Sequence, residues 1–247
     1  MKTLNSPKVI VARAALAALG SALACAQVWA QTQCEVKTGA RVTPVIELYT
    51  SEGCSSCPPA DRWLSTLKGQ PVVAQAFHVG YWDYIGWVDR FATPAHTARQ
   101  RDLAALNNLR SIYTPQVLRN GRDWRDFSTA VAGGAMARAA ITVQRIGSTE
   151  AYEARVTPGT DVKQWQAYWT VTEHGYNSKV KAGENSGEFL QHDFVVRQYV
   201  PLGRYEGANT VRLGAIPAVA GHSRQVNLVV TDPATGDTLQ AASLQCG

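Results

Sequence analysis

The sequence predicts an α/β domain, in which helices flank a mixed β-sheet, followed by a smaller all-β, sandwich-like domain. Three observations lead to this prediction. Apolar strand patterns alternate with helical patterns from residue 45 to about residue 141. From about residue 152 onward apolar residues recur with a period of two, as in half-buried strands. Gly147-Ser148-Thr149 marks the change, so we expect one domain over residues 31–147 and a second over residues 148–247.

Two strands with a helix between them open the first half. The apolar run 45–50 predicts a strand, and the run 72–79 is continuous enough to predict a strand that is buried on both faces. Apolar residues on one helical face predict a helix over residues 60–67, which Gly69-Gln70-Pro71 ends. This order predicts a strand–helix–strand unit with a right-handed crossover.

A second helix, a hairpin and a third helix complete the first half. Thr93-Pro94 has the pattern of an N-cap followed by a first-turn proline, and apolar residues continue this helix to residue 109. Residues 116–119 predict a short strand, and Asn120-Gly121 predicts a tight hairpin turn. The segment from Asp126 through Ile141 predicts a third helix.

Short antiparallel strands are expected in the second half. In residues 165–172 the apolar side chains alternate with polar ones, and residues 226–230 repeat the pattern. Turn residues recur at 157–159, 185–187 and 233–237. Gly183-Glu184-Asn185-Ser186-Gly187 is either a tight turn or a binding loop, and we favour the turn. Strands at this spacing predict a sandwich of about 100 residues.

The first thirty residues have the pattern of an export signal. Lys2, Lys8 and Arg13 precede an apolar stretch over residues 14–24, which is short and rich in alanine. Small residues favour cleavage near Ala30, and a lipoprotein-type cleavage before Cys25 is the weaker alternative. We therefore expect a periplasmic or secreted protein without a membrane span in its mature part.

The charge balance gives little support for nucleic-acid binding. The chain carries 24 Lys and Arg against 19 Asp and Glu, a net charge of +5. The export signal holds three of these bases and no acid, so residues 31–247 carry only +2. We expect no nucleic-acid partner.

Four cysteines lie beyond the export signal, and export implies an oxidising compartment in which cysteines are usually paired. Cys54 and Cys57 are close neighbours, which leaves Cys34 with Cys246 as a structural disulfide between the two ends of the mature chain. Two unpaired thiols at Cys34 and Cys246 are the alternative.

The segment Cys54-Ser55-Ser56-Cys57 carries the chemistry that the sequence predicts. It lies between a buried strand and a helix that begins with prolines, and the N-terminal end of a helix stabilises a thiolate. We expect Cys54 to be the more exposed cysteine, which attacks a substrate, and Cys57 to lie deeper and resolve the mixed disulfide. The hydroxyls of Ser55 and Ser56 can donate to the thiolate, and we expect both residues to contact the substrate.

With Thr114-Pro115 about sixty residues further on, this cysteine pair resembles that of the thioredoxin superfamily. The resemblance implies that the Thr114–Pro115 bond is cis and that Thr114 and Pro115 present backbone to an extended substrate. The acid found beneath the cysteines of thioredoxin is Leu48 here, with Glu47 one place away. Glu47 is therefore either a proton acceptor for Cys57 or a carboxylate at a sheet edge or domain contact, and we favour the second.

A closer resemblance covers nearly the whole mature chain. Residues 47–61, which read ELYTSEGCSSCPPAD, and residues 78–84, 86–87 and 97–100 are similar to an exported bacterial thioredoxin-like family of unknown function. In the second half, residues 183–185, His192 and residues 195–197 are similar to the same family. The resemblance implies a thioredoxin-like domain followed by a β-rich domain, and it implies no substrate.

These observations predict an exported thiol–disulfide oxidoreductase without a cofactor. Its partners would be a protein or small-molecule thiol or disulfide substrate and a second redox partner. The alternative is a non-catalytic thioredoxin-fold binding or scaffolding module in which Cys54 and Cys57 form a structural disulfide. A metal site is not expected, because zinc takes four ligands and neither a second cysteine pair nor a spaced histidine pair is present.

Overall fold

The compact part of the chain is built mainly from strands. The computed structural model describes residues 1–2, 34–127, 131 and 134–246, and Gln33–Gly247 form one compact unit. Strands make up 41% of the described residues and helices 11%. The described ranges contain two α-helices, α1 (Pro58–Ser65) and α2 (Pro94–Leu106), and the 3₁₀ helix η1 (Asp83–Ile85). From residue 3 onward the predicted export signal, with Cys25 and Ala30, lies outside the described residues.

Among the described residues, neither helix has the length and apolar character that a membrane crossing requires.

One eight-stranded sheet runs through both halves of the chain. The first half contributes β2 (Val45–Thr50), β3 (Val73–His78), β4 (Gln116–Arg119) and β5 (Arg122–Asp123). The second half contributes β8 (Trp165–Glu173), β11 (Val195–Tyr205), β13 (Arg224–Thr231) and β14 (Thr238–Leu244). The strand order is β14-β13-β8-β11-β3-β2-β4-β5, and β11 is a parallel neighbour of β3, with Val195 opposite Ala76.

The predicted fold class, a helix-flanked α/β thioredoxin-like domain followed by a separate sandwich-like domain, is therefore wrong. The chain is mostly β, and its main sheet continues from the first half into the second. Gly147 and Ser148, where the sequence predicts a boundary, lie between β6 (Ala139–Arg145) and β7 (Ala151–Pro158), which are antiparallel neighbours. Periodicity predicts each strand from its own residues, whereas the pairing of β3 with β11 joins residues that are far apart in the sequence.

A four-stranded sheet contains β6 and β7 between β1 (Glu35–Lys37) and β12 (Asn209–Gly214). Ile141, the end of the predicted third helix, lies in β6, and residues 128–130 and 132–133 are outside the described residues. Ala139, Ile141 and Val143 are buried and alternate with more exposed side chains. This is the period of a strand, so the helix predicted to end here is wrong.

The period of two predicted for residues 165–172 is confirmed by the two cores on either side of β8. Trp165 and Trp169 of β8 pack with Leu228 of β13 against side chains of β6, β7 and β12. Tyr168, which points to the opposite face, packs with Phe77 of β3 and with residues of β2 and α2. The second-half strands are thus covered by a sheet on one face and by first-half residues on the other.

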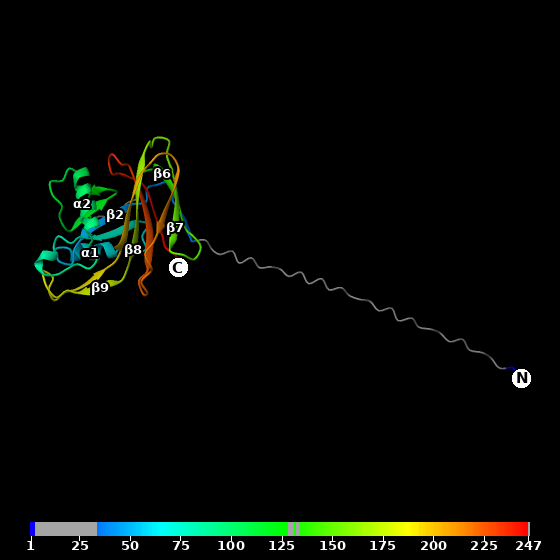
Figure 1. Ribbon diagram of the computed structural model, residues 1–247, viewed down its shortest axis with the longest axis horizontal. Coiled ribbons are helices and arrows are strands. Elements are labelled where there is room, and N and C mark those ends of the chain that lie inside the picture. The colour runs from blue at the N-terminus through cyan, green and yellow to red at the C-terminus, as the bar shows by residue number, and fades with distance from the viewer. Residues whose placement is uncertain (3–33, 128–130, 132–133, 247) are drawn as a thin grey trace. The chain divides into compact units, whose positions relative to one another are not determined.

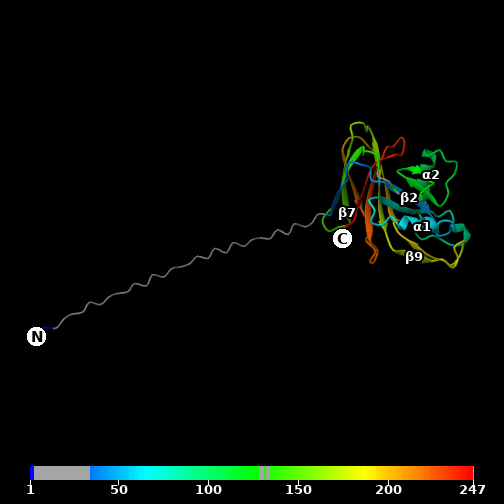
Figure 2. The same ribbon diagram turned by 180° about the vertical axis from the view of Figure 1, so that it is seen from behind.

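The two helices cover opposite faces of the strands β3, β2 and β4. Leu64 of α1 packs with Ile46, whereas Leu103 of α2 packs with Val45, the neighbour of Ile46 on the same strand. Thr93 caps α2 as predicted, because its side chain accepts a hydrogen bond from the backbone N–H of His96. Both helices lie at the end of the compact unit that is remote from β6 and β7 (Figures 1 and 2).

A buried ionic cluster lies where β2, β8 and α2 meet. Glu47 is 2% exposed and accepts two hydrogen bonds from the guanidinium of Arg99, at 2.7 and 2.9 Å. The hydroxyls of Tyr49 and Tyr168 donate to the same carboxylate at 3.0 and 2.9 Å. Glu47 therefore joins the two halves of the chain, which is the role that the sequence favours over that of a proton acceptor for Cys57.

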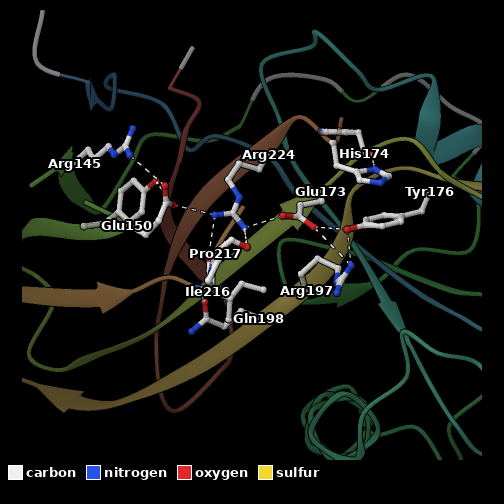
Figure 3. Close-up of polar contacts among 12 residues, drawn as sticks. Arg145, Glu150, Glu173, His174, Tyr176, Arg197, Gln198, Ile216, Pro217 and Arg224 are labelled. Carbon is white, nitrogen blue, oxygen red and sulfur yellow. Dashed lines mark hydrogen bonds and ion pairs between the residues drawn. The ribbon is translucent and has the colours of Figure 1, made fainter. Parts of the chain in front are cut away.

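A second buried carboxylate, Glu173 at the end of β8, ties three neighbouring strands together (Figure 3). Arg224 of β13 lies 2.7 Å from it, and Arg197 of β11 lies 3.7 Å away on its other side. Tyr176 donates a hydrogen bond to Glu173. Arg224 also forms a salt bridge with Glu150, at 3.0 Å. Because these charges pair with opposite charges across strands, we interpret the cluster as structural.

The predicted disulfide between Cys34 and Cys246 is confirmed, and it closes a loop with a sequence separation of 212 residues. Replacing both cysteines by serine removes this constraint from the unfolded chain. We expect the free energy of unfolding to fall, by at most about 5 kcal/mol in the chain-entropy model. Urea unfolding followed by tryptophan fluorescence measures the change, and an unaltered midpoint would contradict it.

Arg99→Met leaves the Glu47 carboxylate buried without its cation, so we expect a loss of about 3 kcal/mol in stability. The matched control is Glu47→Leu combined with Arg99→Met, which removes both charges and should cost less than the sum of the two single changes. Thermal and urea unfolding of the four proteins completes the double-mutant cycle. Additive losses would show that the pair is not coupled.

Candidate functional site

The cysteine pair lies at the start of α1, as the sequence predicts. Cys54 and Cys57 are joined in a disulfide, and Cys57 is the N-cap residue of α1. Pro58 and Pro59 follow in the first turn, where the lack of an N–H group costs no hydrogen bond. Because β2 ends at Thr50, the Cys-Ser-Ser-Cys segment is held between a buried strand and a helix.

Both cysteines are buried, so the expected difference in exposure between Cys54 and Cys57 is almost absent. Cys54 is 1% exposed and Cys57 is fully buried, whereas Ser55 and Ser56 between them are exposed. The hydroxyl of Ser56 lies 3.4 Å from Sγ of Cys54. Sequence spacing places Cys54 at the helix start, but it does not reveal the segments from elsewhere in the chain that cover it.

The first covering segment is the loop between β9 (Tyr176–Lys179) and β10 (Phe189–His192). The amide of Asn185 donates to the backbone carbonyls of Glu52 and Cys54 at 2.8 and 3.0 Å. The carboxylate of Glu184 accepts a 3.0 Å hydrogen bond from the backbone N–H of Ser55. Hydrogen bonding to the side chain of Ser55, and then to this N–H group, lowers the pKa of Glu184. This loop is thus a tight turn, as favoured, and it also holds the backbone on both sides of Cys54.

The second covering residue is Trp82, which connects Gly53 with the Thr-Pro segment. A Cβ added at Gly53 would come within 3.0 Å of Cβ of Trp82, so only glycine fits against this side chain without a shift. The indole N–H of Trp82 donates to the hydroxyl of Thr114 at 2.7 Å. The Thr114–Pro115 bond is cis. Because Tyr49 of β2 pairs with Gln116 of β4, Pro115 lies at the end of the sheet where the cysteine loop begins.

A buried polar cluster lies next to the cysteine loop. Its members are Glu52, Asp61, His78, Asp89 and His192. Nδ1 of His78 lies 2.7 Å from Oδ2 of Asp89, and Nε2 of His192 lies 3.2 Å from Oε1 of Glu52. Asp61 of α1 accepts a 2.9 Å hydrogen bond from the hydroxyl of Thr50. The rings of His78 and His192 are in edge contact, with centroids 4.9 Å apart.

Burial and ionic partners shift the pKa values in this cluster in different directions. Burial raises the pKa of Asp61, and the two histidines offset only part of that effect. Burial alone would lower the pKa of His78, but the Asp89 carboxylate reverses this and places the pKa above its ordinary value. Burial would raise the pKa of Asp89 and Glu52, but their contacts with His78 and His192 lower both. Glu52 and Asp89 therefore favour the ionised form, and Asp61 favours the protonated form more than a free carboxyl does.

The structure thus brings together the predicted site residues Cys54, Ser55, Ser56, Cys57, Thr114 and Pro115 at one end of the sheet. The sequence predicts no role in the site for Asp61 and the two histidines of the cluster. Asp61 carries a weak signal, because it follows Cys57 by four positions and such residues share one face of a helix. His78 and His192 belong to segments that resemble the family, but spacing alone does not link them, since they meet only when β11 pairs with β3.

Two solved structures share the fold. Protein AGR_C_4864 from Agrobacterium tumefaciens matches with a TM-score of 0.61 and 21% sequence identity, over 84% of this chain and 96% of that chain. HBP35 of Porphyromonas gingivalis matches with a TM-score of 0.55 and 14% identity, over 83% of this chain and 75% of that chain. At these identities the likeness concerns the fold alone.

No curated protein matches the chain. A family model described as "Protein of unknown function (DUF1223)" matches residues 45–231, which include the cysteine pair, the Thr-Pro segment and the polar cluster. The predicted membership in a family of unknown function is thereby confirmed, and the description assigns no activity. The chain belongs to the DUF1223 family.

Proposed function

We propose that the protein is an exported thiol–disulfide oxidoreductase that uses Cys54 and Cys57. The observation that carries this proposal is the disulfide itself, formed between two cysteines three positions apart at the start of α1. The N-terminal end of a helix stabilises the thiolate that appears when such a bond opens. Thr114 and Pro115 lie at the same end of the sheet, where their backbone can receive an extended substrate.

The reaction exchanges two electrons between the cysteine pair and a substrate disulfide. In the reduced protein the Cys54 thiolate attacks one sulfur of the substrate, forms a mixed disulfide and releases the other sulfur as a thiolate. The Cys57 thiolate then attacks Sγ of Cys54, which re-forms the Cys54–Cys57 disulfide and releases the second substrate thiol. The reverse order of steps oxidises a substrate dithiol. A second thiol or disulfide partner restores the starting state in either direction.

Access to Cys54 requires the cover to move. The hydrogen bonds of Glu184 and Asn185 and the packing of Trp82 against Gly53 all lie around this cysteine. The hydrogen bond between Glu184 and the backbone N–H of Ser55 is exposed to solvent, so we expect it to break at little cost in free energy. In this proposal a substrate chain displaces Glu184 and forms hydrogen bonds with the freed N–H group of Ser55.

The burial of both cysteines favours a second candidate, a binding or scaffolding module with a structural disulfide. In that case Ser55 and Ser56 are surface residues of a closed loop, and the bond does not open in function. The two candidates differ in one observable property, which is whether Cys54 forms mixed disulfides.

Cys57→Ser removes the resolving thiol, so a mixed disulfide formed at Cys54 cannot be released. We expect this variant, expressed in the periplasm, to accumulate covalent adducts that run at higher mass on non-reducing gels and disappear on reduction. Cys54→Ser is the matched control and should give few adducts, because Cys57 lies deeper. Equal or absent adducts in both variants would reject the oxidoreductase and favour the structural disulfide.

Asn185→Ala leaves the buried carbonyls of Glu52 and Cys54 without their donor, which loosens the cover over the cysteine pair. We expect dithiothreitol to reduce the Cys54–Cys57 bond about 10-fold faster in this variant, since losing the two hydrogen bonds of Asn185 lowers the cost of opening by about 1–2 kcal/mol. Mass spectrometry after timed alkylation measures the rate. Ser186→Ala, an exposed neighbour in the same loop, is the control, and equal rates in both variants would show that the loop does not limit access.

A further inference from the structure

Three metal-binding side chains converge in the buried polar cluster. Asp61, His78 and His192 each place one ligand atom so that the three atoms lie within 4.8 Å of one another. They come from α1, from the end of β3 and from the end of β10. His78 and His192 are 0% and 2% exposed, so their unbonded nitrogens have no access to bulk water.

Three of the four ring nitrogens of His78 and His192 lack hydrogen-bond partners. Nε2 of His78 and both ring nitrogens of His192 are buried and unpartnered. A buried polar atom that forms no hydrogen bond costs about 1–3 kcal/mol, and native structures contain few of them. Two such histidines beside a buried carboxylate are the arrangement that a bound cation would satisfy.

The opposite side of each histidine faces a carboxylate. Nδ1 of His78 lies 2.7 Å from Asp89, which leaves Nε2 free to bind a metal. Nε2 of His192 lies 3.2 Å from Oε1 of Glu52, without the alignment of a hydrogen bond, and leaves Nδ1 free. Metal-bound histidines in proteins usually have such a carboxylate behind the ring, because it fixes the tautomer and makes the ligand nitrogen more basic.

A small hollow lies against two residues of the cluster. It has a volume of about 70 Å³, and Asp61 and His192 line it together with Pro58, Arg62 and Gln191. The hollow is large enough to hold water. A water molecule there would lie beside Asp61 and His192, two of the three ligands.

We propose that Asp61, His78 and His192 bind one divalent transition-metal ion, for which Zn²⁺ is the best fit. Two imidazoles and one carboxylate suit Zn²⁺, and a fourth, open position can hold water. At Zn–ligand distances of about 2.0 Å, tetrahedral donor atoms lie about 3.3 Å apart, so the three side chains draw together when the ion binds. This site goes beyond the proposed redox function and uses neither cysteine.

Zinc titration of the full chain, without a polyhistidine tag and with both disulfides intact, tests the site. Competition with a chromophoric chelator should show one Zn²⁺ per chain. Co²⁺ in place of Zn²⁺ should give the visible absorption of a tetrahedral or five-coordinate site without a thiolate-to-cobalt band. A thiolate band, or the absence of stoichiometric binding, would overturn the proposal.

Variants identify the ligands. His192→Gln and Asp61→Asn should each lower the Zn²⁺ affinity by about 100-fold or more, and Asp89→Asn by about 10- to 100-fold through His78. His222→Gln, outside the cluster, is the matched control and should bind as the parent does. Circular dichroism establishes that each variant is folded, and a Zn²⁺-dependent rise in melting temperature in the parent and His222→Gln alone provides a second readout. Equal affinity in His192→Gln and His222→Gln would overturn the site.

The double variant Cys54→Ser, Cys57→Ser separates this inference from the proposed redox function. It cannot perform thiol–disulfide exchange, yet it should retain Zn²⁺ binding, because its sulfurs are not ligands. Loss of Zn²⁺ binding in this folded variant would reject Asp61, His78 and His192 as the ligand set. Adduct formation by Cys57→Ser is a separate result, so either proposal can fail while the other stands.

Discussion

The parallel pairing of β11 with β3 is the constraint on which the rest of the structure depends. Through Val195 and Ala76 it joins the strands of the second half to those of the first in one sheet. His78 ends β3, and His192 precedes β11 by only a few residues, so this pairing brings both histidines to the same end of the sheet. The loop that carries Glu184 and Asn185 arrives with the same segment. Without this pairing, the cover of the cysteine loop would lose Asn185, and the polar cluster would lose His192.

The two faces of the joined sheet have different tasks. On the α2 face, Glu47 binds Arg99 and Tyr168 and fixes the first half against β8. On the α1 face, Asp61 and the cysteine pair lie at the strand ends, where side chains of three segments meet. Glu47 and Leu48 illustrate the separation, since neighbouring residues of one strand point to opposite faces. A proton acceptor for Cys57 therefore has to come from the α1 face, and Glu47 lies on the other.

The sequence predicts the elements whose signals are local. The strand at residues 45–50, the Thr93 cap, the Asn120-Gly121 turn and the alternation in β8 depend on neighbouring residues, and all are found. The disulfides also follow from cysteine spacing. The fold class could not be obtained in this way, because it depends on β11 pairing with β3 and not with another strand. For the same reason the sequence places Cys54 at a helix start but does not reveal that Asn185, more than a hundred residues away, covers it.

Glu52 connects the cover of the cysteine pair to the polar cluster. Its carbonyl accepts from Asn185, its N–H donates to Asp89, and its carboxylate lies between Trp87 and His192. Because Glu52 is two residues before Cys54, any backbone movement that exposes Cys54 also shifts the carboxylate behind His192. An ion bound to His192 would in turn resist that movement, since displacing a group behind a ligand lowers the affinity for the metal. If the proposed ion binds, its presence in the cluster would therefore oppose access to the disulfide through a single buried residue, Glu52.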